Sequence, residues 1–578
     1  MTIAMDDNGR ASGLVSPSQR IWIAGEELPL QRIYGNEREH SSRLLLTQPG
    51  QGTVREWTWG AAVEEARRIA AHLKAQNFPP GSRIVILSKN CAWWIMADFA
   101  IWMAGHVSVP IFPSLREVSL AAILNHCEPA ACFLGLLEHP PEITGTPLEG
   151  LHRITFPGAA PSSGTIAWEE ILGGQAPIEG SPVREPLETA TIIYTSGTTG
   201  EPKGVMQTFQ SLALMAKSME PTLAGDGSLD RILSYLPLAH IAERAIVEIN
   251  CLYLPLHIFF AESQQTFLHD LARARPTIFF TVPRLLVRFQ QGVLEKAPEP
   301  KLRRLLRIPV VRALVRKRIL KALALDSVRL AASGSAPLPV DLLQWYRGLG
   351  LNLVEGYGMT ETGITHVPLP GRVRPGYVGH ASPFADTRVA GDGEVQIKGP
   401  MNLAGYYRNP ELTRASFTLD GYFRTGDRGE IDSDGRLRIV GRLKEEFKTS
   451  KGKYVIPAPI EQKLMASGLF ESVCVLGAGI AAPFAAVVLI DGKRSLTGAQ
   501  ETRRLLEDEL ELAMRRVNHE LERHEQLRFL VVDEEPWTVD NGLMTPTLKA
   551  RRALIEARFF PFNSAEPAER AVLWREAK

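Results

Sequence analysis

The chain has 578 residues, a length that corresponds to about three or four packing units. Its 65 basic and 64 acidic side chains give a net charge of +1, which argues against a nucleic-acid-binding protein. Hydrophobic residues make up 45% of the chain and charged residues 22%, so it can bury large cores and is not expected to be intrinsically disordered.

The five cysteines are odd in number, scattered along the chain, and contain no CxxC pair. We therefore expect neither a disulfide framework nor a structural zinc site, and a reducing compartment fits best. The N-terminal residues 1–18 are polar and lack the apolar core of a signal peptide. These features predict a cytoplasmic protein.

The apolar residues 92–112 are hydrophobic enough to resemble a membrane span. Asp98 and His106 lie inside this stretch, however, and a charge in the middle of a span is costly in lipid. We predict instead a buried helix over residues 91–104, followed by a strand over residues 107–112.

Short apolar runs rich in β-branched residues alternate with helical patterns as far as about Gly376, which indicates α/β layers with mostly parallel sheets. Strands are predicted over residues 83–87, 107–112, 130–134, 191–194, 232–235, 255–260, 277–282, 328–332 and 351–355. Helices are predicted over residues 61–76, 117–125, 264–274, 283–295 and 339–348. The Gly- and Pro-rich residues 141–186 are predicted to be an excursion on the surface.

Residues 301–321 contain nine basic and no acidic side chains, interleaved with Leu and Val and split by Pro309. A basic amphipathic helix of this kind can lie on an anionic membrane surface, which would make the protein peripheral to a membrane. The alternative is a solvated helix pair, packed on the rest of the chain through its Leu and Val side.

The pattern changes after Gly376. Residues 389–398, 429–431 and 435–440 alternate like strands, and the turns at 391–393 (Gly-Asp-Gly) and 434–435 (Asp-Gly) suit β-hairpins. A charged amphipathic helix is predicted over residues 501–526. The predicted fold class is therefore α/β, with a large N-terminal domain of layered α/β subdomains (residues 1–442) and a small α+β C-terminal domain (residues 443–578).

A Gly-, Ser- and Thr-rich loop follows the strand predicted over residues 191–194. Its glycines allow several backbone N–H groups to turn toward one point, and its hydroxyl groups and lysine add further donors, so it can hold a polyanion. It is not a Walker A loop, because Lys203 is followed by Gly204 rather than by Ser or Thr. The residues of this phosphate loop are Thr195, Ser196, Gly197, Thr198, Thr199, Gly200 and Lys203.

Two further clusters contain side chains suited to a nucleotide. In residues 356–361 (Gly-Tyr-Gly-Met-Thr-Glu), Tyr357 can offer its flat face to a base, and Glu361 can bind a hard cation such as Mg²⁺. In residues 424–427 (Arg-Thr-Gly-Asp), the carboxylate of Asp427 can accept the two hydroxyls of a ribose. Taken alone, each cluster is more typical of an ordinary turn.

These clusters belong to six motifs in a fixed order, at residues 195–204, 334–337 (Gly-Ser-Ala-Pro), 357–361, 424–427, 441–444 (Gly-Arg-Leu-Lys) and 545–549 (Thr-Pro-Thr-Leu-Lys). In this order they resemble the adenylate-forming superfamily of acyl-CoA synthetases, luciferases and peptide-synthetase adenylation domains, over residues 56–552. Residues 236–244 (Leu-Pro-Leu-Ala-His-Ile-Ala-Glu-Arg), 441–448, 450–455 and 541–549 are most similar to AMP-forming long-chain fatty-acid–CoA ligases.

The resemblance implies two half-reactions. The carboxylate of a fatty acid attacks the α-phosphorus of ATP to give acyl-AMP and pyrophosphate, and the thiol of CoA then displaces AMP to give acyl-CoA. The implied cofactors and co-substrates are ATP, Mg²⁺ and CoA, and the partners are the fatty acid, ATP and CoA, without nucleic acid. The C-terminal domain is implied to be a mobile lid that rotates between the steps about a hinge at Lys444.

By the same resemblance, each candidate residue receives a role. The catalytic residues would be Lys549, Thr360, Glu361 and His240, and the metal ligands would be Thr198 and Glu361. Besides the phosphate loop, cofactors would be bound by Gly334, Ser335, Ala336, Glu355, Gly356, Tyr357, Gly358, Asp427, Arg442 and Lys453. A core histidine with a satisfied ring is the alternative for His240.

Three alternatives concern function. Residues 246–260 and 278–286 could line an apolar tunnel for an acyl chain, or could be ordinary core. An adenylating ligase that loads the acyl group onto a carrier protein or another acceptor would use the same first half-reaction. A non-catalytic acyl- or nucleotide-binding protein is a third possibility, against which the presence of Lys549, Glu361 and the phosphate loop argues.

Overall fold

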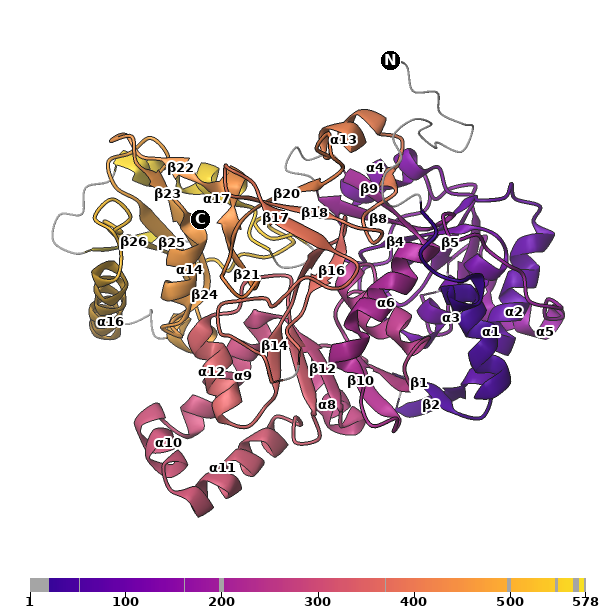
Figure 1. Ribbon diagram of the computed structural model, residues 1–578, viewed down its shortest axis with the longest axis horizontal. Helices are drawn as coiled ribbons and strands as arrows, with labels where there is room; N and C mark the ends of the chain where they lie inside the picture. The colour runs from indigo at the N-terminus through magenta and orange to yellow at the C-terminus, as the bar shows by residue number, and fades with distance from the viewer. Residues whose placement is uncertain are drawn as a thin grey trace.

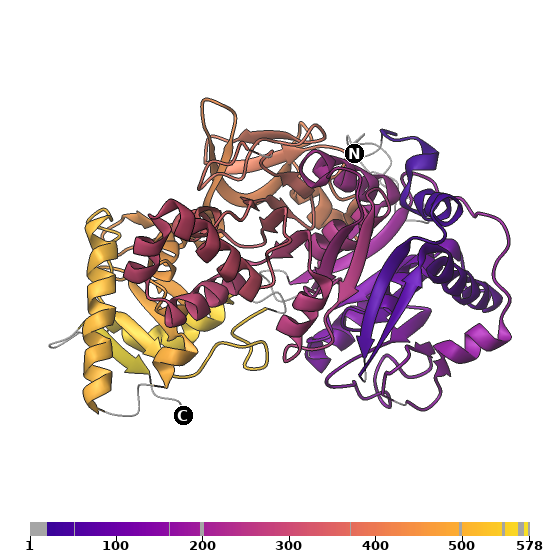
Figure 2. The same ribbon diagram turned by 90° about the horizontal axis from the view of Figure 1, so that it is seen from below.

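The structure is a computed structural model that describes residues 20–50, 52–160, 162–196, 202–369, 371–495, 500–545, 549–564 and 571–575. A large N-terminal part contains several α/β layers, and a smaller C-terminal α+β part lies at one end of the molecule (Figure 1). Figure 2 shows the same division from below, with the C-terminal elements in yellow. The predicted fold class is confirmed, and the boundary at residue 442 stays a prediction.

An eight-stranded sheet forms one layer of the large part, in the order β19-β9-β8-β4-β3-β5-β6-β7. The pairs from β8 to β7 are parallel, and the β8–β9 and β9–β19 pairs are antiparallel. Its strands are β3 (Arg83–Leu87), β4 (Val107–Ile111), β5 (Ala131–Leu134), β6 (His152–Thr155), β7 (Ile166–Ala167), β8 (Thr189–Ser196), β9 (Pro202–Thr208) and β19 (Gly405–Tyr406). The central strands are continuous apolar runs because both faces of a parallel sheet are covered.

The expectation of a surface excursion over residues 141–186 is wrong. This segment supplies β6 and β7 to the eight-stranded sheet, together with helix α5 (Trp168–Gly174), whose Trp168 side chain is fully buried. Most of the described Gly and Pro residues lie between these short elements, and Gly173 and Gly174 end α5.

The membrane-like stretch forms the buried helix and strand that the sequence predicts. Every residue of α3 (Ala92–Met103) is buried, and Gly105, with φ of +88°, turns the chain into β4. α2 (Trp59–Ala75) packs on α3. Within the described residues, no helix combines the length and hydropathy needed to cross a bilayer.

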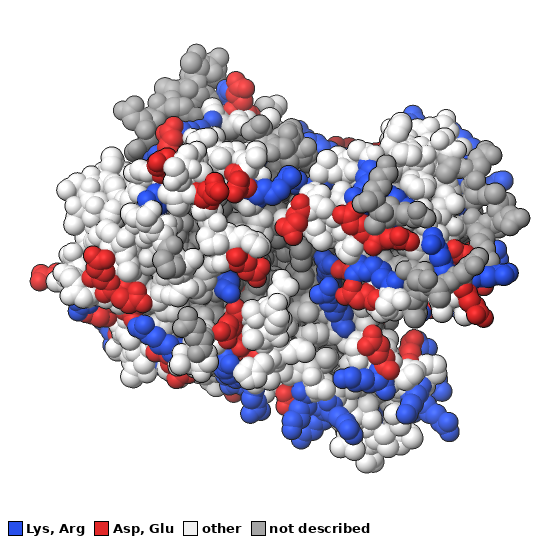
Figure 3. Space-filling model, turned by 180° about the vertical axis from the view of Figure 1, so that it is seen from behind, with Lys and Arg blue, Asp and Glu red and all other residues white. Residues whose placement is uncertain are grey.

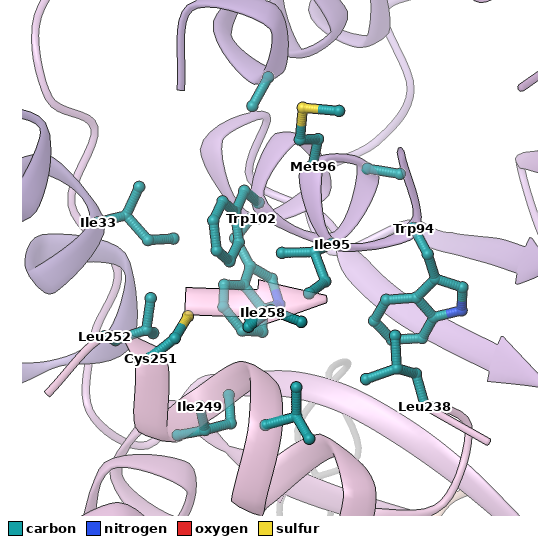
Figure 4. Close-up of a cluster of buried hydrophobic side chains, with 14 of the residues drawn as sticks. Ile33, Trp94, Ile95, Met96, Trp102, Leu238, Ile249, Cys251, Leu252 and Ile258 are labelled. Atoms are coloured by element: carbon teal, nitrogen blue, oxygen red, sulfur yellow. The ribbon is translucent and has the colours of Figure 1, made fainter. Parts of the chain in front are cut away.

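The core around α3 also contains residues from the segment between Ile241 and Phe260 (Figure 4). Figure 4 places Trp94, Ile95, Met96 and Trp102 near Leu238, Ile249, Cys251, Leu252 and Ile258. Asp98 of α3 forms a buried ion pair with Arg244, which begins the short π-helix η3 (Arg244–Ile249). Residues 246–260 are thus largely core, and a tunnel along them stays a prediction.

A second and a third sheet complete the α/β layers. The second has the order β10-β11-β1-β2, with β10 (Asp230–Ser234), β11 (Leu256–Phe260), β1 (Leu44–Gly50) and β2 (Thr53–Thr58). The third is a parallel sheet of β12 (Ile278–Thr281), β13 (Leu330–Ser333) and β14 (Leu353–Glu355), with α8 (Phe267–Ala274), α9 (Pro283–Lys296) and α12 (Val340–Gly348) nearby. Ser333 pairs with Glu355, so the motifs that follow β13 and β14 leave the same edge of this sheet.

An antiparallel sheet leads from the large part to the C-terminal part. Its strands β17 (Asp386–Val389), β18 (Glu394–Lys398), β20 (Phe423–Ile431) and β21 (Leu437–Arg442) pair in that order. The predicted hairpins are confirmed: Gly393 and Gly435 have positive φ values of 85° and 80° in the β17–β18 and β20–β21 turns.

The C-terminal part is α+β, as predicted. A short hairpin of β22 (Phe447–Lys448) and β23 (Tyr454–Val455) precedes α14 (Pro457–Met465). Its main sheet has the order β24-β25-β26-β27, with β24 (Phe470–Leu476), β25 (Phe484–Leu489), β26 (Leu530–Asp533) and β27 (Val572–Arg575). Helices α16 (Gln500–His519) and α17 (Arg552–Phe559) accompany this sheet. α16 ends short of the predicted residue 526, because the Asn518 side chain bonds the Leu527 backbone.

Candidate active site

The structure brings together motifs that are far apart in the sequence. The chain after β13 meets the chain after β14, where the Gly356 N–H donates to the Ser333 carbonyl oxygen at 2.9 Å. A Cβ on Gly334 would lie 3.3 Å from the Gly356 carbonyl oxygen, so this close backbone approach suits glycine. The β15–β16 hairpin follows directly, with β15 (Tyr357–Met359) and β16 (Gly363–His366).

The turn after β13 is held in place by Glu355. Ser335 has a left-handed backbone, with φ of +66°, and Ala336 follows it toward α12. Glu355 Oε1 accepts a hydrogen bond from the Leu338 N–H at 2.8 Å. Burial raises the pKa of Glu355 to about 7, and the bond from Leu338 opposes that rise. The carboxyl of Glu355 thus positions the Gly334–Ala336 turn.

Asp427 on β20 connects two other candidates. The Tyr357 hydroxyl donates to Asp427 Oδ2 at 2.6 Å, and the Arg442 Nε lies 2.8 Å from Asp427 Oδ1. Burial raises the pKa of Asp427, whereas Arg442 and the Tyr357 hydrogen bond act to lower it. Burial also raises the pKa of Tyr357, and the Asp427 charge raises it further. Because the Asp427 carboxylate is buried between a phenol and a guanidinium, it has a fixed orientation.

Glu361 is half-buried and lies close to the β8–β9 hairpin. Its Oε1 accepts a hydrogen bond from the Tyr406 hydroxyl at 3.0 Å, a partner that no sequence motif indicates. Burial raises the pKa of Glu361, and the positive charges of Arg442 and Lys203 oppose that rise. The neighbouring Thr360 is buried, and its carbonyl oxygen accepts from Gln207 Nε2 at 2.7 Å.

The phosphate loop is only partly described. Thr195 pairs with Lys203 in the β8–β9 hairpin, so both lie where the two strands approach the loop. Gly197, Thr198, Thr199 and Gly200 lie outside the described residues, as does the side chain of Ser196. In the described ranges, three or more His, Cys, Asp or Glu side chains do not gather in a way that could hold a metal ion.

His240 lies at the start of the short helix α7 (Ile241–Glu243). Its Nδ1 accepts a hydrogen bond from the Ala242 N–H at 3.2 Å, which places the proton of the neutral ring on Nε2. Burial and the nearby charge of Lys549 lower the pKa of His240 to about 3. The ring is therefore neutral at physiological pH, with Nε2–H as its donor.

The loop before His240 is fixed by two buried side chains to which the sequence motifs assign no role. Asn90 donates to the Leu236 carbonyl oxygen at 2.6 Å and accepts from the Leu238 N–H at 2.9 Å. Glu243 accepts from the Ser234 hydroxyl at 2.9 Å and from the Tyr235 N–H at 3.0 Å. Asn90 belongs to no sequence motif. Glu243 lies inside the 236–244 motif, and its acidic side chain is the feature that could have identified it as a functional residue.

Lys549, in the C-terminal part, lies near the candidate residues of the large part. The charge of Lys549 affects the pKa of both His240 and Asp427, which places its ammonium near them. Desolvation is the largest cause that lowers the pKa of Lys549, and the positive charge of Arg442 lowers this pKa further. The carboxylates of Asp427, Glu361 and Glu445 act in the opposite direction.

The two remaining candidates lie at the edge of this cluster. Lys444 is exposed in the short helix η4 (Leu443–Glu445), which follows β21 directly. Lys453 is exposed in the turn before β23, where its backbone bonds Thr449, and its side chain forms no ion pair with a described residue. Among the described residues, neither Lys444 nor Lys453 forms a side-chain hydrogen bond or ion pair with the candidates above.

The C-terminal part is also joined to α9 of the large part. Glu471 on β24 forms an ion pair with Arg284, and Arg288 Nη2 lies 3.5 Å from the same carboxylate. Gln291 Nε2 donates to the Gly468 carbonyl oxygen at 3.1 Å. These contacts accompany the orientation in which Lys549 faces Asp427.

Comparison with known proteins agrees with this arrangement. Residues 36–407 match the family model of the AMP-binding enzymes. A long-chain-fatty-acid–CoA ligase of Mycobacterium bovis is 29% identical over 91% of this chain and 95% of its own length. Human long-chain-fatty-acid–CoA ligase 1 is 29% identical over 86% of this chain and 80% of its own length.

Solved structures show the same fold. The adenylation domain of a carboxylate reductase from Mycobacterium chelonae superposes with a TM-score of 0.77 at 20% identity, covering 94% of this chain and 91% of that domain. The ATP-bound structure of MatB from Rhodopseudomonas palustris gives a TM-score of 0.73 at 23% identity, covering 93% of this chain and all of that one. Since the family model spans well over half of its length, the chain belongs to the AMP-binding enzyme family.

Proposed function

We propose that this enzyme is an AMP-forming ligase that activates a long-chain fatty acid as acyl-AMP and transfers the acyl group to CoA. The observation that carries the proposal is the position of Lys549, a residue of a separate part of the chain whose charge interacts with Asp427, Glu361 and His240. The names of the bacterial and human relatives support a fatty acid as the substrate and CoA as the acceptor. Residues 1–442 would bind the nucleotide and acyl group, and residues 443–578 would form the lid.

In the first half-reaction, a carboxylate oxygen of the fatty acid forms a bond to the α-phosphorus of ATP, and the bond from this phosphorus to the pyrophosphate oxygen breaks. Both reactants are anions, so a positive charge placed between them stabilises the transition state. Lys549 would supply that charge, and Thr360 would contact the α-phosphate. The phosphate loop with Lys203 would bind the departing pyrophosphate.

The nucleoside would lie between β14 and β20. Tyr357 and the Gly334–Ala336 turn, which Glu355 positions, would hold the adenine. Gly356 and Gly358 would allow the backbone to approach the ring closely. Asp427 would accept the ribose hydroxyls, and Arg442, which already orients Asp427, would assist it.

Glu361 fits a hard cation such as Mg²⁺. Its carboxylate is half-buried, forms no ion pair with any described residue, and has a second oxygen besides the one that accepts from Tyr406. Glu361 would hold the cation together with Thr198 and phosphate oxygens of ATP. When bound, Mg²⁺ would neutralise charge on the pyrophosphate that leaves.

His240 would contribute in its neutral form. With Nδ1 occupied by the Ala242 N–H, its Nε2–H is the group that can donate to an oxygen of the fatty-acid carboxylate or of acyl-AMP. The Asn90 and Glu243 bonds fix the loop that carries it. His240 would therefore orient the substrate rather than transfer a proton.

In the second half-reaction, the CoA sulfur attacks the acyl carbonyl carbon and AMP leaves. The thiol needs access to the carbon that Lys549 faces, so the lid must move first. Lys444, exposed directly after β21, would be the hinge. Rotation would withdraw Lys549 and bring another face of the lid to the site, with Lys453 of the β22–β23 turn toward CoA.

The decisive experiment is CoA-dependent release of AMP, measured across carboxylates from acetate to long-chain fatty acids. We expect the highest kcat/KM with long-chain acids and no thioester without free CoA. Formation of acyl-AMP with no thioester formed from added free CoA would instead favour transfer to a carrier protein. A flat profile across chain lengths would contradict the long-chain assignment.

We also propose a cytoplasmic location, which agrees with five free and buried cysteines. Peripheral contact with an anionic membrane would bring the enzyme to its fatty-acid substrate. Nucleic acid is not among the proposed partners, given the balanced net charge.

A further inference from the structure

A helical hairpin formed by α10 (Glu299–Leu306) and α11 (Pro309–Ala322) projects from the large part beyond α9 and α12 (Figure 1). Its inner side is anchored: Leu302 is buried, and Ile319 and Leu320 pack against the core cluster that contains Leu325. The predicted break at Pro309, where α11 begins, is confirmed. The hairpin is thus a fixed projection of the fold.

The outer side of the hairpin is strongly basic. Nine Lys and Arg side chains lie between residues 301 and 321, and the one acid of the two helices, Glu299, pairs with Arg303 at 2.6 Å. The other eight have no carboxylate within ion-pair distance in the part of the chain that the structure describes: Lys301, Arg304, Arg307, Arg312, Arg316, Lys317, Arg318 and Lys321. Like charges at this density repel one another, so an anionic surface would stabilise them.

Apolar side chains are exposed among these charges. Val310 is 83% exposed, Leu314 is 71% exposed, and Ile308 is 49% exposed. We call these three residues the hairpin tip. In Figure 3 the lobe at the lower right carries blue basic side chains around white ones.

The spacing along α11 places apolar and basic groups on the same outer side. Val310 and Leu314 are one helical turn apart, and Lys317 and Lys321 continue that side at intervals of three and four residues. α11 is therefore apolar on its inner side, through Ile319 and Leu320, and again at its outer tip. A helix whose outer side contacts only water usually has polar side chains on that side. The exposed Val310 and Leu314 therefore indicate that this side contacts another apolar surface.

We propose that the α10–α11 hairpin docks reversibly on an anionic phospholipid bilayer, with the hairpin tip entering the headgroup region and the surrounding Lys and Arg side chains contacting lipid phosphates. The two features are complementary, because short apolar insertion and electrostatic attraction are each weak alone and are effective together. The benefit for catalysis rests on the proposed fatty-acid substrate, which is concentrated in bilayers, whereas docking itself is measurable without any reaction.

The test is sedimentation of the full-length protein with vesicles of phosphatidylcholine alone or with 30% phosphatidylglycerol, at 50 and 500 mM NaCl. We expect binding to the anionic vesicles at low salt, at least tenfold weaker binding at high salt, and weak binding to neutral vesicles. The triple variant Arg312→Glu/Lys317→Glu/Lys321→Glu should lose at least tenfold in affinity. Val310→Ser/Leu314→Ser should lose affinity at both salt concentrations.

A matched control is Lys74→Glu/Arg372→Glu/Arg523→Glu, which changes the net charge equally at exposed positions away from the hairpin. It should bind vesicles like the unaltered protein. Equal losses in the two triple variants, or no binding to anionic vesicles at low salt, would overturn the proposal. So would charge-dependent binding to a random-sequence DNA duplex in the absence of vesicle binding.

Activity on a water-soluble medium-chain acid, measured without vesicles, separates this proposal from the proposed function. The hairpin variants should retain that activity, since none of their positions belongs to the candidate site. Absence of ligase activity in the unaltered protein would contradict the proposed function but would not change the conclusion from the vesicle experiment.

Discussion

Tyr357 and Asp427, 70 residues apart in the sequence, meet through a 2.6 Å hydrogen bond from the phenol to the carboxylate. This contact joins β15, which follows β14, to β20 of the antiparallel sheet that leads into the C-terminal part. Arg442 holds the other carboxylate oxygen at 2.8 Å. A nucleotide that uses Asp427 therefore meets a carboxylate whose direction is already set, which lowers the entropy lost on binding.

Replacing Asp427 by Ala should raise the KM for ATP by roughly ten- to a hundredfold, the effect of losing one charge-assisted hydrogen bond. The dependence of the initial rate on ATP concentration measures it, at saturating fatty acid and CoA. Tyr357→Phe serves as the comparison, since it keeps the ring and the carboxylate and should change KM less. An unchanged ATP dependence in Asp427→Ala would remove this residue from the site.

Replacing Lys549 by Ala should slow acyl-AMP formation by more than about a hundredfold, because one positive charge between two anions is lost. It should largely spare thioester formation from supplied acyl-AMP, in which no second anion attacks phosphorus. Single-turnover assays of the two half-reactions distinguish the effects. Lys463→Ala, in an exposed ion pair with Glu520, is the control in the same part of the chain. Equal loss in both steps would refute the assignment.

The contacts of Glu471 should favour the orientation of the lid that supports the first half-reaction. The proposed rotation about Lys444 would separate Glu471 from Arg284 and Arg288 of α9. We expect Glu471→Gln to slow acyl-AMP formation by roughly fivefold, since a partly exposed ion pair contributes up to about 1 kcal/mol.

The thioester step should be unchanged or faster in Glu471→Gln. The control is Glu509→Gln, which removes a surface ion pair with Lys493 inside the C-terminal part. Identical rates in the two variants, or an equal slowing of both half-reactions in Glu471→Gln, would show that the α9 contact does not bias the lid.

Sequence patterns predict the fold best where burial is continuous. Residues 83–87 coincide with β3, because a continuous apolar, β-branched run is typical of a strand that is covered on both faces. The prediction fails over residues 141–186, where two- and four-residue strands are too short to show a period. It also places the end of α16 too late, since the hydrogen bonds between Asn518, in the last turn of the helix, and Leu527 are not encoded by a helical period.

The site is predictable only as a set of motifs. The resemblance names Tyr357, Asp427, Arg442 and Lys549, and the structure places them close to one another. It cannot supply the partners that orient them, because contacts such as Tyr406 with Glu361 join segments without a common pattern. The C-terminal part contacts α9 through pairs such as Glu471 with Arg284, which spacing along the chain does not encode.

Glu243 should make the stability of the protein depend on pH. Its carboxyl is buried behind the loop that carries His240, and burial raises its pKa to about 8 from an ordinary value of 4.5. The hydrogen bonds from Ser234 and Tyr235 oppose this rise without cancelling it. The folded protein therefore holds this proton more tightly than the unfolded chain. The resulting stability is complete below about pH 4.5 and is lost as the pH rises toward 8.

Replacing Glu243 by Gln keeps the acceptor oxygen and imitates the protonated carboxyl, so the variant and the unaltered protein should have similar Tm values at pH 4.5. At pH 8.5 the variant should be more stable, because it escapes the ionisation that costs the unaltered protein about 1.4 kcal/mol for each pKa unit. A difference of roughly 3–10 °C in Tm is expected at that pH for a domain of this size. Calorimetric scans of both proteins, with Glu509→Gln as a surface control, measure it. Parallel Tm curves from pH 5.5 to 8.5 would mean that Glu243 is ionised in the folded protein throughout this range.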